Sequence, residues 1–320
     1  MDISHIATTL TDQKKVIVIA GPTASGKTAL SLRLAQCLPC EIISADSRQI
    51  YRFLDIGTAK PTREELQQVT HHFIDHLNPD ENFSAGLFAQ EASELVKSLF
   101  RQKKIPLIVG GTGLYIKALC EGFISEESDS FSLPEQQRVR TSLEQELQTD
   151  GIDSLYAKLL ECDPPSARLY SDKNPRRIIR ALEFFSLNNT PFSEAQKRDT
   201  KRPEFSNITF CINEERSLLY DRINRRTEEM WNSGLVEETE RVLEMGFSPS
   251  LNSLNTVGYK ETIAFIKGEI SAPEAINLIA QHTRNYAKRQ VTWFKKIDGM
   301  IPIEKDITPL ELLNLIALQA

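Results

Sequence analysis

The feature that most constrains this chain is a glycine-rich loop between a short apolar segment and a helical pattern. The segment Lys15-Val-Ile-Val-Ile-Ala20 is rich in β-branched residues and predicts a buried strand. It runs directly into Gly21-Pro-Thr-Ala-Ser-Gly-Lys-Thr28, which fits the pattern G-x-x-x-x-G-K-T. Apolar residues then recur at helical spacing from Thr28 to Ala35. Strand, loop and helix in this order indicate an α/β protein that binds a di- or triphosphate.

The residue types of this loop suit that chemistry. Gly21 and Gly26 let the backbone fold around an anion, toward which successive N–H groups and the helix N-terminus point. Lys27 adds a positive charge that reaches the outer phosphates, and the Thr28 hydroxyl is placed to bind Mg²⁺. The expected anion-binding residues are Gly21, Pro22, Thr23, Ala24, Ser25, Gly26, Lys27 and Thr28.

A second expected strand, residues 42–45, ends at Asp46. In open α/β sheets ligands bind beyond the carboxyl ends of the strands, so we expect Asp46 in the same crevice as the phosphate loop. Three roles fit it: a partner of Mg²⁺, a general base, or simply a helix-capping residue. The turn that follows, Ser47, Arg48 and Gln49, is unusually polar and indicates contact with a polar ligand.

A second glycine-rich turn lies after the expected strand Lys104–Val109. The sequence Gly110-Gly-Thr-Gly113 follows this strand at once, so it also points into the crevice, unless it is a plain tight turn. Thr112 carries the one hydroxyl in that turn, and we expect it to face the phosphate loop.

Composition excludes several classes of protein. The N-terminus lacks the pattern of a signal peptide and no apolar run is long enough to span a bilayer, so we expect a cytoplasmic protein. A net charge of −6 argues against wholesale nucleic-acid binding, but net charge hides local patches. The five cysteines are scattered and odd in number, which favours free thiols over disulfides. His71, His72 and His76 are expected to make hydrogen bonds rather than to bind a metal.

The middle of the chain has a different character. Residues 123–199 carry helical patterns without a strand between them, and they are expected to form a helical insertion domain. The surrounding core would comprise residues 1–122 and 200–320, with Phe205–Ile212 as a strand that rejoins the sheet.

From residues alone, three functions compete. They are a small-molecule P-loop kinase, a transferase that delivers a group from a diphosphate to a nucleic acid, and a nucleotide-dependent switch without chemistry. Clusters of arginine on an otherwise acidic chain favour the transferase. Asp46 and Thr112 beside the phosphate loop argue against the switch.

The motifs taken together resemble the tRNA dimethylallyltransferase (tRNA isopentenyltransferase) family. They occur in order over nearly the whole chain, and the lack of a C-terminal zinc finger makes the bacterial form the closer likeness. The motifs are Gly21–Thr28, Ser44–Gln49, Asp55-Ile-Gly-Thr-Ala-Lys-Pro61, His71-His72, Val109–Tyr115, Asn174-Pro-Arg-Arg177, Arg180–Glu183, Val257-Gly-Tyr-Lys-Glu261, Ala287–Gln290 and Thr292–Phe294.

This resemblance implies a fold and a reaction. The fold would be a P-loop NTPase-like parallel sheet flanked by helices, with the insertion domain contacting tRNA. The phosphate loop would hold dimethylallyl diphosphate and Mg²⁺ rather than ATP. The acceptor would be the exocyclic amine of the adenosine 3′ of the anticodon, in tRNAs that read codons beginning with U, flipped out of its stack. We expect the enzyme to be a monomer.

The resemblance also implies roles for single residues. Asp46 would orient the adenine amine and accept its proton, while Lys27, Thr112 and Arg226 would stabilise the departing diphosphate and Thr28 would bind the metal. The expected contacts with the tRNA anticodon stem-loop are Asp46, Ser47, Arg48, Gln49, Thr112, Arg140, Arg176, Arg177, Arg180, Asn255, Thr256, Val257, Gly258, Tyr259 and Lys260.

Overall fold

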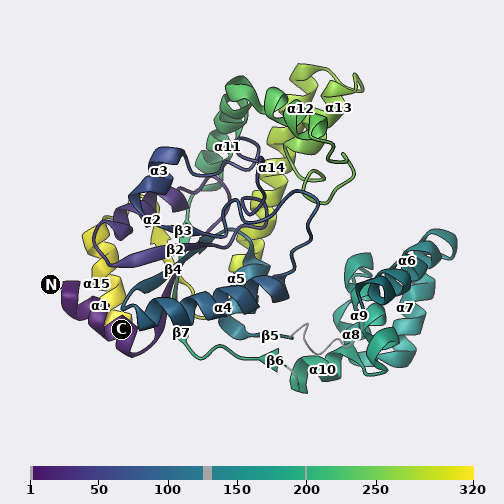
Figure 1. Cartoon of the computed structure of the whole chain (residues 1–320), viewed down its shortest axis with the longest axis horizontal. Coiled ribbons are helices and arrows are strands. Elements are labelled where there is room, and N and C mark those ends of the chain that lie inside the picture. Colours follow the sequence, from purple (N-terminus) through teal and green to yellow (C-terminus); the bar gives the residue numbers. More distant parts are fainter. Residues whose placement is uncertain (1–2, 125–131, 199) are drawn as a thin grey trace. The chain divides into compact units, whose positions relative to one another are not determined.

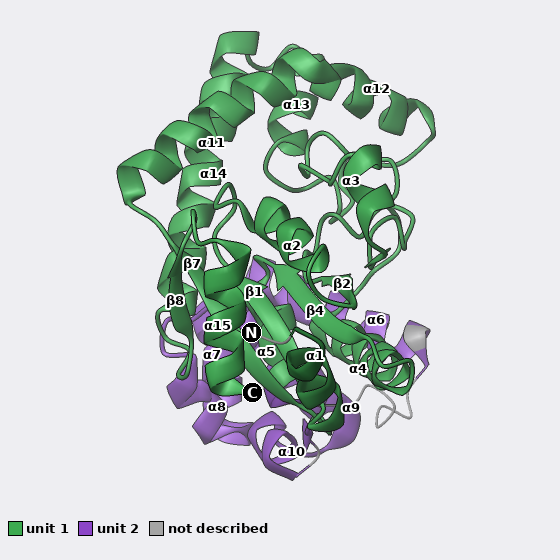
Figure 2. Ribbon diagram, turned by 90° about the vertical axis from the view of Figure 1, so that its left-hand side faces the viewer, with its two compact units in different colours: residues 1–120, 203–320 green, residues 121–202 purple. Residues whose placement is uncertain are grey.

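A computed structural model describes residues 3–124, 132–198 and 200–320 of the chain. It consists of two compact units, coloured separately in Figure 2. Unit 1 joins the residues up to Cys120 to Pro203–Ala320, and unit 2 is Glu121–Arg202. The borders expected from the sequence, near residues 122 and 200, lie close to these. The acidic stretch 125–131 falls outside the described residues.

Unit 1 is built on a six-stranded sheet with the order β3-β2-β4-β1-β7-β8 (Figure 1). All five pairings are parallel, which confirms the expected fold class. The strand from the second half of the chain, β7, pairs with β1, so the chain does rejoin the sheet after the insertion. The strands are β1 (Lys15–Ala20), β2 (Cys40–Ser44), β3 (His71–His72), β4 (Ile105–Gly110), β7 (Ser206–Asn213) and β8 (Ile301–Glu304).

Helices flank this sheet and bury alternate side chains of its strands. Ile17 and Ile19 of β1 point into a core formed with helices from both ends of the chain, while Val16 and Val18 point to the opposite face. The two terminal helices pack on each other, which places the N- and C-terminal segments side by side (Figure 1). The helices of unit 1 are α1 (Ile3–Asp12), α2 (Lys27–Ala35), α3 (Arg63–Gln68), α4 (Ala85–Arg101), α5 (Gly113–Glu121), α11 (Arg216–Met230), α12 (Val236–Glu244), α13 (Tyr259–Ile266), α14 (Ala272–Phe294) and α15 (Pro309–Gln319).

A kink separates α11 from α12. The π-helical turn Trp231–Leu235 joins them, and Gly234 adopts a φ of 102° inside it, a value that other residues rarely adopt. Gly234 therefore marks the break between the two helices, and α12 starts at Val236. In the described part of the chain, no helix combines the length and apolar character needed to cross a membrane.

Unit 2 is mainly helical, as the sequence predicts. Its own core gathers apolar residues such as Leu155, Leu159 and Ile178. A short antiparallel pair, β5 (Phe123–Ile124) and β6 (Thr200–Lys201), joins the two ends of the unit. The helices are α6 (Leu133–Thr149), α7 (Gly151–Cys162), α8 (Pro164–Leu169), α9 (Pro175–Asn188) and α10 (Phe192–Arg198).

The short helices α8 and α10 are held by one buried carboxylate. Asp163 is fully buried and accepts hydrogen bonds from the backbone N–H and hydroxyl of Ser166, at 3.2 and 2.6 Å. It also accepts from the N–H and hydroxyl of Ser193, at 2.9 and 2.5 Å. Burial alone would raise the pKa of Asp163, but these four hydrogen bonds outweigh it and hold the pKa below its ordinary 3.8.

We predict that Asp163→Asn destabilises unit 2 by about 2–4 kcal/mol at pH 7, because an amide cannot accept all four bonds and leaves buried donors unpaired. A pKa lowered by folding contributes stability above pH 3.8 that is lost as the pH falls through the folded-state value. The penalty should therefore shrink toward pH 3. Chemical denaturation of the full chain at both pH values, followed by hydrogen exchange in α8 and α10, measures this.

The matched control is Asp172→Asn, which removes an exposed carboxylate 3.7 Å from Arg177 and should change stability by no more than about 0.5 kcal/mol. Equal stability of the two variants at pH 7 would contradict the role given to Asp163.

Candidate functional site

The phosphate loop lies between the end of β1 and the start of α2. Gly26 caps α2 in the left-handed region with a φ of 89°, and Ala24 also has a positive φ of 62°. This conformation opens the first turn of α2, whose N–H groups have no partner within the helix. The Ser25 hydroxyl is fully buried in the loop and has no hydrogen-bond partner among the described residues. Exposed helix N–H groups beside an unsatisfied hydroxyl suit an anion.

Lys27 brings its charge to this loop from the first position of α2. Its Nζ donates a hydrogen bond to the carbonyl of Pro22 at 2.7 Å. Burial, opposed by the Asp46 carboxylate and reinforced by the Arg226 guanidinium, lowers the pKa of Lys27 to about 8. These three side chains therefore lie close enough to influence one another. Lys27 and Arg226 do so although they are 199 positions apart in the sequence.

Arg226 reaches the loop from α11. Its Nη2 donates to Thr23 Oγ1 at 2.6 Å. Burial lowers the pKa of Arg226 and the Asp46 carboxylate opposes this, yet a guanidinium remains charged under such shifts. One helical turn earlier, Arg222 Nε donates to the carbonyl of Ala24 at 2.8 Å. Sequence analysis did not single out Arg222; its i, i+4 spacing to Arg226 is the signal that points to it.

Asp46 and Thr112 connect the turns that follow β2 and β4. Asp46 Oδ1 accepts the N–H groups of Arg48 and Gln49 at 2.9 and 3.3 Å, so it does cap its own turn. Thr112 Oγ1 accepts the N–H of Ser47 at 3.0 Å. Capping of the turn uses only Oδ1 of Asp46. The Asp46 carboxylate also interacts electrostatically with Lys27 and Arg226.

Tyr286 of α14 extends this cluster and was not singled out from the sequence. It lies near Thr112, and burial together with the Asp46 carboxylate raises the pKa of its phenol to about 12. Tyr286 is thus a neutral hydroxyl beside Asp46 at pH 7.

A second residue of α14, Gln290, ties the phosphate loop to the turn after β4. Its Oε1 accepts the N–H of Thr23 and its Nε2 donates to the carbonyl of Gly111, both at 2.8 Å. A Cβ on Gly111 would lie 2.3 Å from that Nε2, which is why this position requires glycine. The Thr23 N–H is therefore engaged, Pro22 has none, and the Ser25 N–H donates to the Pro22 carbonyl at 3.3 Å. The N–H groups left for an anion are those of Ala24 and of residues 26–28.

The expected tRNA-contacting segments of unit 1 also come together. Arg48 Nη1 donates to the carbonyl of Asn252 at 2.7 Å, beside the 255–260 segment. Within that segment Asn255 and Lys260 are exposed. Tyr259 is fully buried, so its side chain packs inside unit 1, and the contact of this residue with tRNA stays a prediction.

Within unit 2, two of the expected arginines converge. Arg140 of α6 and Arg180 of α9 lie 3.7 and 3.4 Å from the buried carboxylate of Glu183. Arg177 pairs with Asp172 at 3.7 Å and lies over the ring of Tyr170, with 6.0 Å to its centroid. Arg176 is exposed at the start of α9. These residues form a partly neutralised basic surface of unit 2.

The histidines and cysteines have ordinary roles. His72 Nε2 is 2.7 Å from Glu41, and His76 Nε2 is 3.1 Å from Glu91. All five cysteines are free. No group of three His, Cys, Asp or Glu side chains suited to a metal ion occurs among the residues that the structure describes. A Mg²⁺ ion would therefore need oxygens from a bound diphosphate beside the Thr28 hydroxyl.

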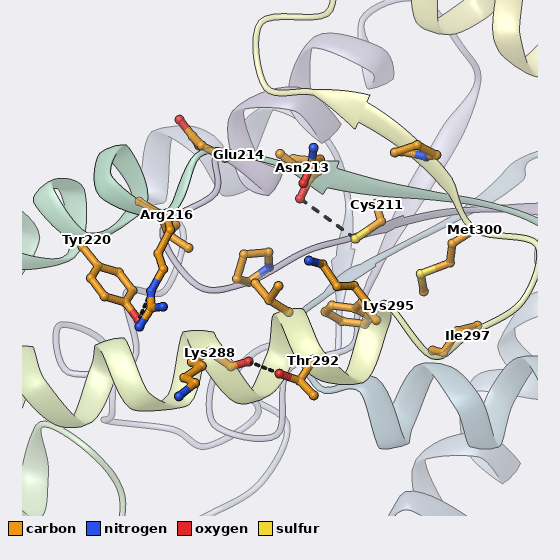
Figure 3. Close-up of a pocket in the computed structure, with 16 residues that line it drawn as sticks. Cys211, Asn213, Glu214, Arg216, Tyr220, Lys288, Thr292, Lys295, Ile297 and Met300 are labelled. Atoms are coloured by element: carbon orange, nitrogen blue, oxygen red, sulfur yellow. Dashed lines mark hydrogen bonds between the residues drawn. The ribbon is translucent and has the colours of Figure 1, made fainter.

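A cavity of about 720 Å³ adjoins the phosphate loop at Pro22 (Figure 3). The end of β7, the start of α11 and the last turns of α14 enclose it, and Lys288 and Lys295 stand at its α14 side. Burial raises the pKa of the Cys211 thiol on its wall to about 11, and the nearby Lys27 ammonium opposes this. The cavity is thus a largely apolar space next to the loop.

Comparisons with known proteins fit this geometry. The family model described as IPP transferase matches residues 49–297, more than half of the chain. A tRNA dimethylallyltransferase of Acetivibrio thermocellus is 43% identical over 292 residues, which cover 91% of this chain and 92% of that protein.

Solved structures agree. The full-length tRNA isopentenylpyrophosphate transferase of Bacillus halodurans superposes with a TM-score of 0.68 at 34% identity, covering 96% of both chains. A eukaryotic dimethylallyltransferase acting on tRNA gives a TM-score of 0.78 at 28% identity, covering 96% of this chain and 77% of its own. The chain therefore belongs to the IPP transferase family.

Proposed function

We propose that the chain transfers the dimethylallyl group from dimethylallyl diphosphate to the exocyclic amine of an adenosine in tRNA and releases diphosphate. The acceptor is the adenosine 3′ of the anticodon in tRNAs that read codons beginning with U. As a member of its family the chain is an enzyme, a tRNA prenyltransferase. The observation that carries the assignment of the site is the convergence of Lys27, Arg226 and Asp46 at the phosphate loop, with Thr112 holding the turn that follows Asp46.

Leaving-group activation supplies much of the catalysis, because the exocyclic amine of adenine is a poor nucleophile. Negative charge grows on the diphosphate as the allylic C–O bond breaks. Lys27, Arg226 and the N–H groups of Ala24 and residues 26–28 are fixed before the reaction and stabilise that charge, with one such donor contributing on the order of 3 kcal/mol. Mg²⁺ held through Thr28 would neutralise further charge on the diphosphate.

Asp46 serves as the base. One carboxylate oxygen is fixed by the N–H groups of Arg48 and Gln49, so the side chain cannot rotate freely. The carboxylate accepts a hydrogen bond from the adenine amine and so directs the lone pair of the amine nitrogen toward the allylic carbon. It takes the proton of the amine as the C–N bond forms. Thr112 fixes the same turn from the opposite side, through the N–H of Ser47.

Recognition of tRNA uses two surfaces. The surface in unit 1 consists of the polar turn 47–49 and the exposed part of the segment 255–260. In unit 2 the arginines Arg140, Arg176, Arg177 and Arg180 contact phosphates of the anticodon stem, where each displaced counterion favours binding. The enzyme acts as a monomer in the cytoplasm, where its tRNA substrates are found.

Mass spectrometry of the tRNA tests the function. An unmodified tRNA that reads U-starting codons is incubated with the protein, Mg²⁺ and dimethylallyl diphosphate. We expect a gain of one prenyl unit at the adenosine 3′ of the anticodon. Chelation of Mg²⁺ should slow the reaction strongly, because less charge on the diphosphate is neutralised.

Parallel reactions separate the alternatives. With ATP in place of the allylic diphosphate, no mass should be gained. Prenylation of AMP but not of tRNA would assign the chain to enzymes that modify free nucleotides, and consumption of ATP without any prenylation would indicate a kinase.

Replacement of Asp46 tests the base. Asp46→Asn keeps a side chain that can cap the turn but cannot accept a proton, so the transfer rate should fall by about 10²-fold or more. The affinity for tRNA should stay within a few-fold, since the amide still fits the turn. Single-turnover rates and tRNA binding are measured on the same preparation, with the exposed Asp80→Asn as control. A variant as active as the wild type would remove Asp46 as the base.

A further inference from the structure

One buried carboxylate far from the phosphate loop has an unusual set of partners. Glu238 of α12 is only 3% exposed. Its Oε1 accepts the N–H groups of Ile56 and Gly57, each at 3.1 Å, and its Oε2 accepts those of Asp55 and Ile56 at 3.1 and 2.9 Å. Three consecutive backbone N–H groups thus converge on one side chain, in the manner of an anion-binding nest.

The same carboxylate holds the segment 255–260. The Tyr259 hydroxyl donates to Glu238 Oε1 at 2.5 Å. Burial, followed by the Glu238 carboxylate, raises the pKa of Tyr259 well above its ordinary 10.0, so the phenol is a neutral donor at pH 7. The Tyr259 ring lies directly on Gly57, where a Cβ would be only 2.4 Å from the ring carbons. Glu238 therefore joins the turn at 55–57 to the start of α13.

The loop that begins at residues 55–57 also orients a side chain of the polar segment 47–49, which follows β2. Gln49 Nε2 donates to the carbonyls of Thr58 and Ala59 at 3.3 and 3.0 Å. Lys60 closes the same loop through ion pairs of 2.5 and 2.6 Å with Asp55 and Asp75. The direction of the Gln49 amide therefore depends on where this loop lies. Glu238 fixes the loop through the N–H groups of residues 55–57.

We propose that Glu238 is a positioning residue for tRNA: its buried carboxylate sets the relative placement of Gln49 and the 255–260 segment. This inference rests on the proposed function, in which both segments contact the anticodon loop. Glu238 itself touches neither substrate. None of its partners belongs to the phosphate loop, so its loss should affect recognition of tRNA and leave recognition of dimethylallyl diphosphate intact.

The test compares Glu238→Gln with the wild-type enzyme in steady-state transfer. An amide places an NH₂ group against backbone donors and removes the charge that three N–H groups share, so the turn should loosen. The KM for tRNA should rise about tenfold or more, while the KM for dimethylallyl diphosphate stays within about twofold. Hydrogen exchange at residues 55–57 should accelerate in the same variant.

Two further variants keep the test decisive. Glu240→Gln removes an exposed carboxylate of the same helix and should behave as the wild type. Tyr259→Phe removes one donor and keeps the ring on Gly57, so we expect a smaller, few-fold rise in the KM for tRNA alone. If Glu238→Gln does not fold, as judged by circular dichroism, Tyr259→Phe decides.

Each result has a distinct meaning. An unchanged KM for tRNA in a folded Glu238→Gln variant, or an equal rise of both KM values, would overturn the positioning role. A wild-type enzyme that prenylates no tRNA would overturn the proposed function instead. The hydrogen-exchange rates at residues 55–57 would still show whether Glu238 holds that turn in place.

Discussion

The site depends on one buried amide that joins two loops which the sheet alone does not hold together. β1 and β4 are neighbours, so the phosphate loop and the Gly110–Gly113 turn leave the sheet side by side. Beyond the last hydrogen bond between β1 and β4, the positions of the two loops are set by Gln290. Its side chain is hydrogen-bonded to the N–H of Thr23 and to the carbonyl of Gly111. Because α14 also carries Tyr286, the helix that closes the phosphate loop places a neutral hydroxyl beside Asp46 as well. In the proposed mechanism, α14 therefore positions both the loop that binds the diphosphate and the surroundings of the Asp46 base.

Buried carboxylates recur away from this crevice, and each connects segments distant in sequence. Asp163 holds the starts of α8 and α10 in unit 2, and Glu238 joins the turn at 55–57 to α13 in unit 1. Glu183 gathers the arginines of α6 and α9. A buried charge is tolerated only where donors surround it, so each of these carboxylates specifies how the segments that supply its donors are arranged.

The sequence predicts the parts of this molecule whose cause is local. The strand-loop-helix order around Gly21–Thr28, the strand ends at Asp46 and Thr112, and the return of β7 to the sheet all follow from periodicity and turn chemistry. The strand β8 and the short helices α8 and α10 were not foreseen, because segments of four to seven residues carry too little periodicity. Gln290 and Glu238 could not be given a role, since the backbone groups that they bind are 179 or more residues away. The motif around Tyr259 likewise does not reveal that its ring is buried.

The measurement that tests the central claim most directly is the single-turnover rate of Gln290→Leu with both substrates saturating. Leucine fills a similar volume but leaves the Thr23 N–H and the Gly111 carbonyl unpaired. The account predicts a folded enzyme whose transfer rate falls about tenfold or more, because the activating groups are misplaced relative to Asp46. The same substitution at the exposed Gln281 of α14 should have no effect. A folded Gln290→Leu enzyme that transfers at the wild-type rate would contradict the account.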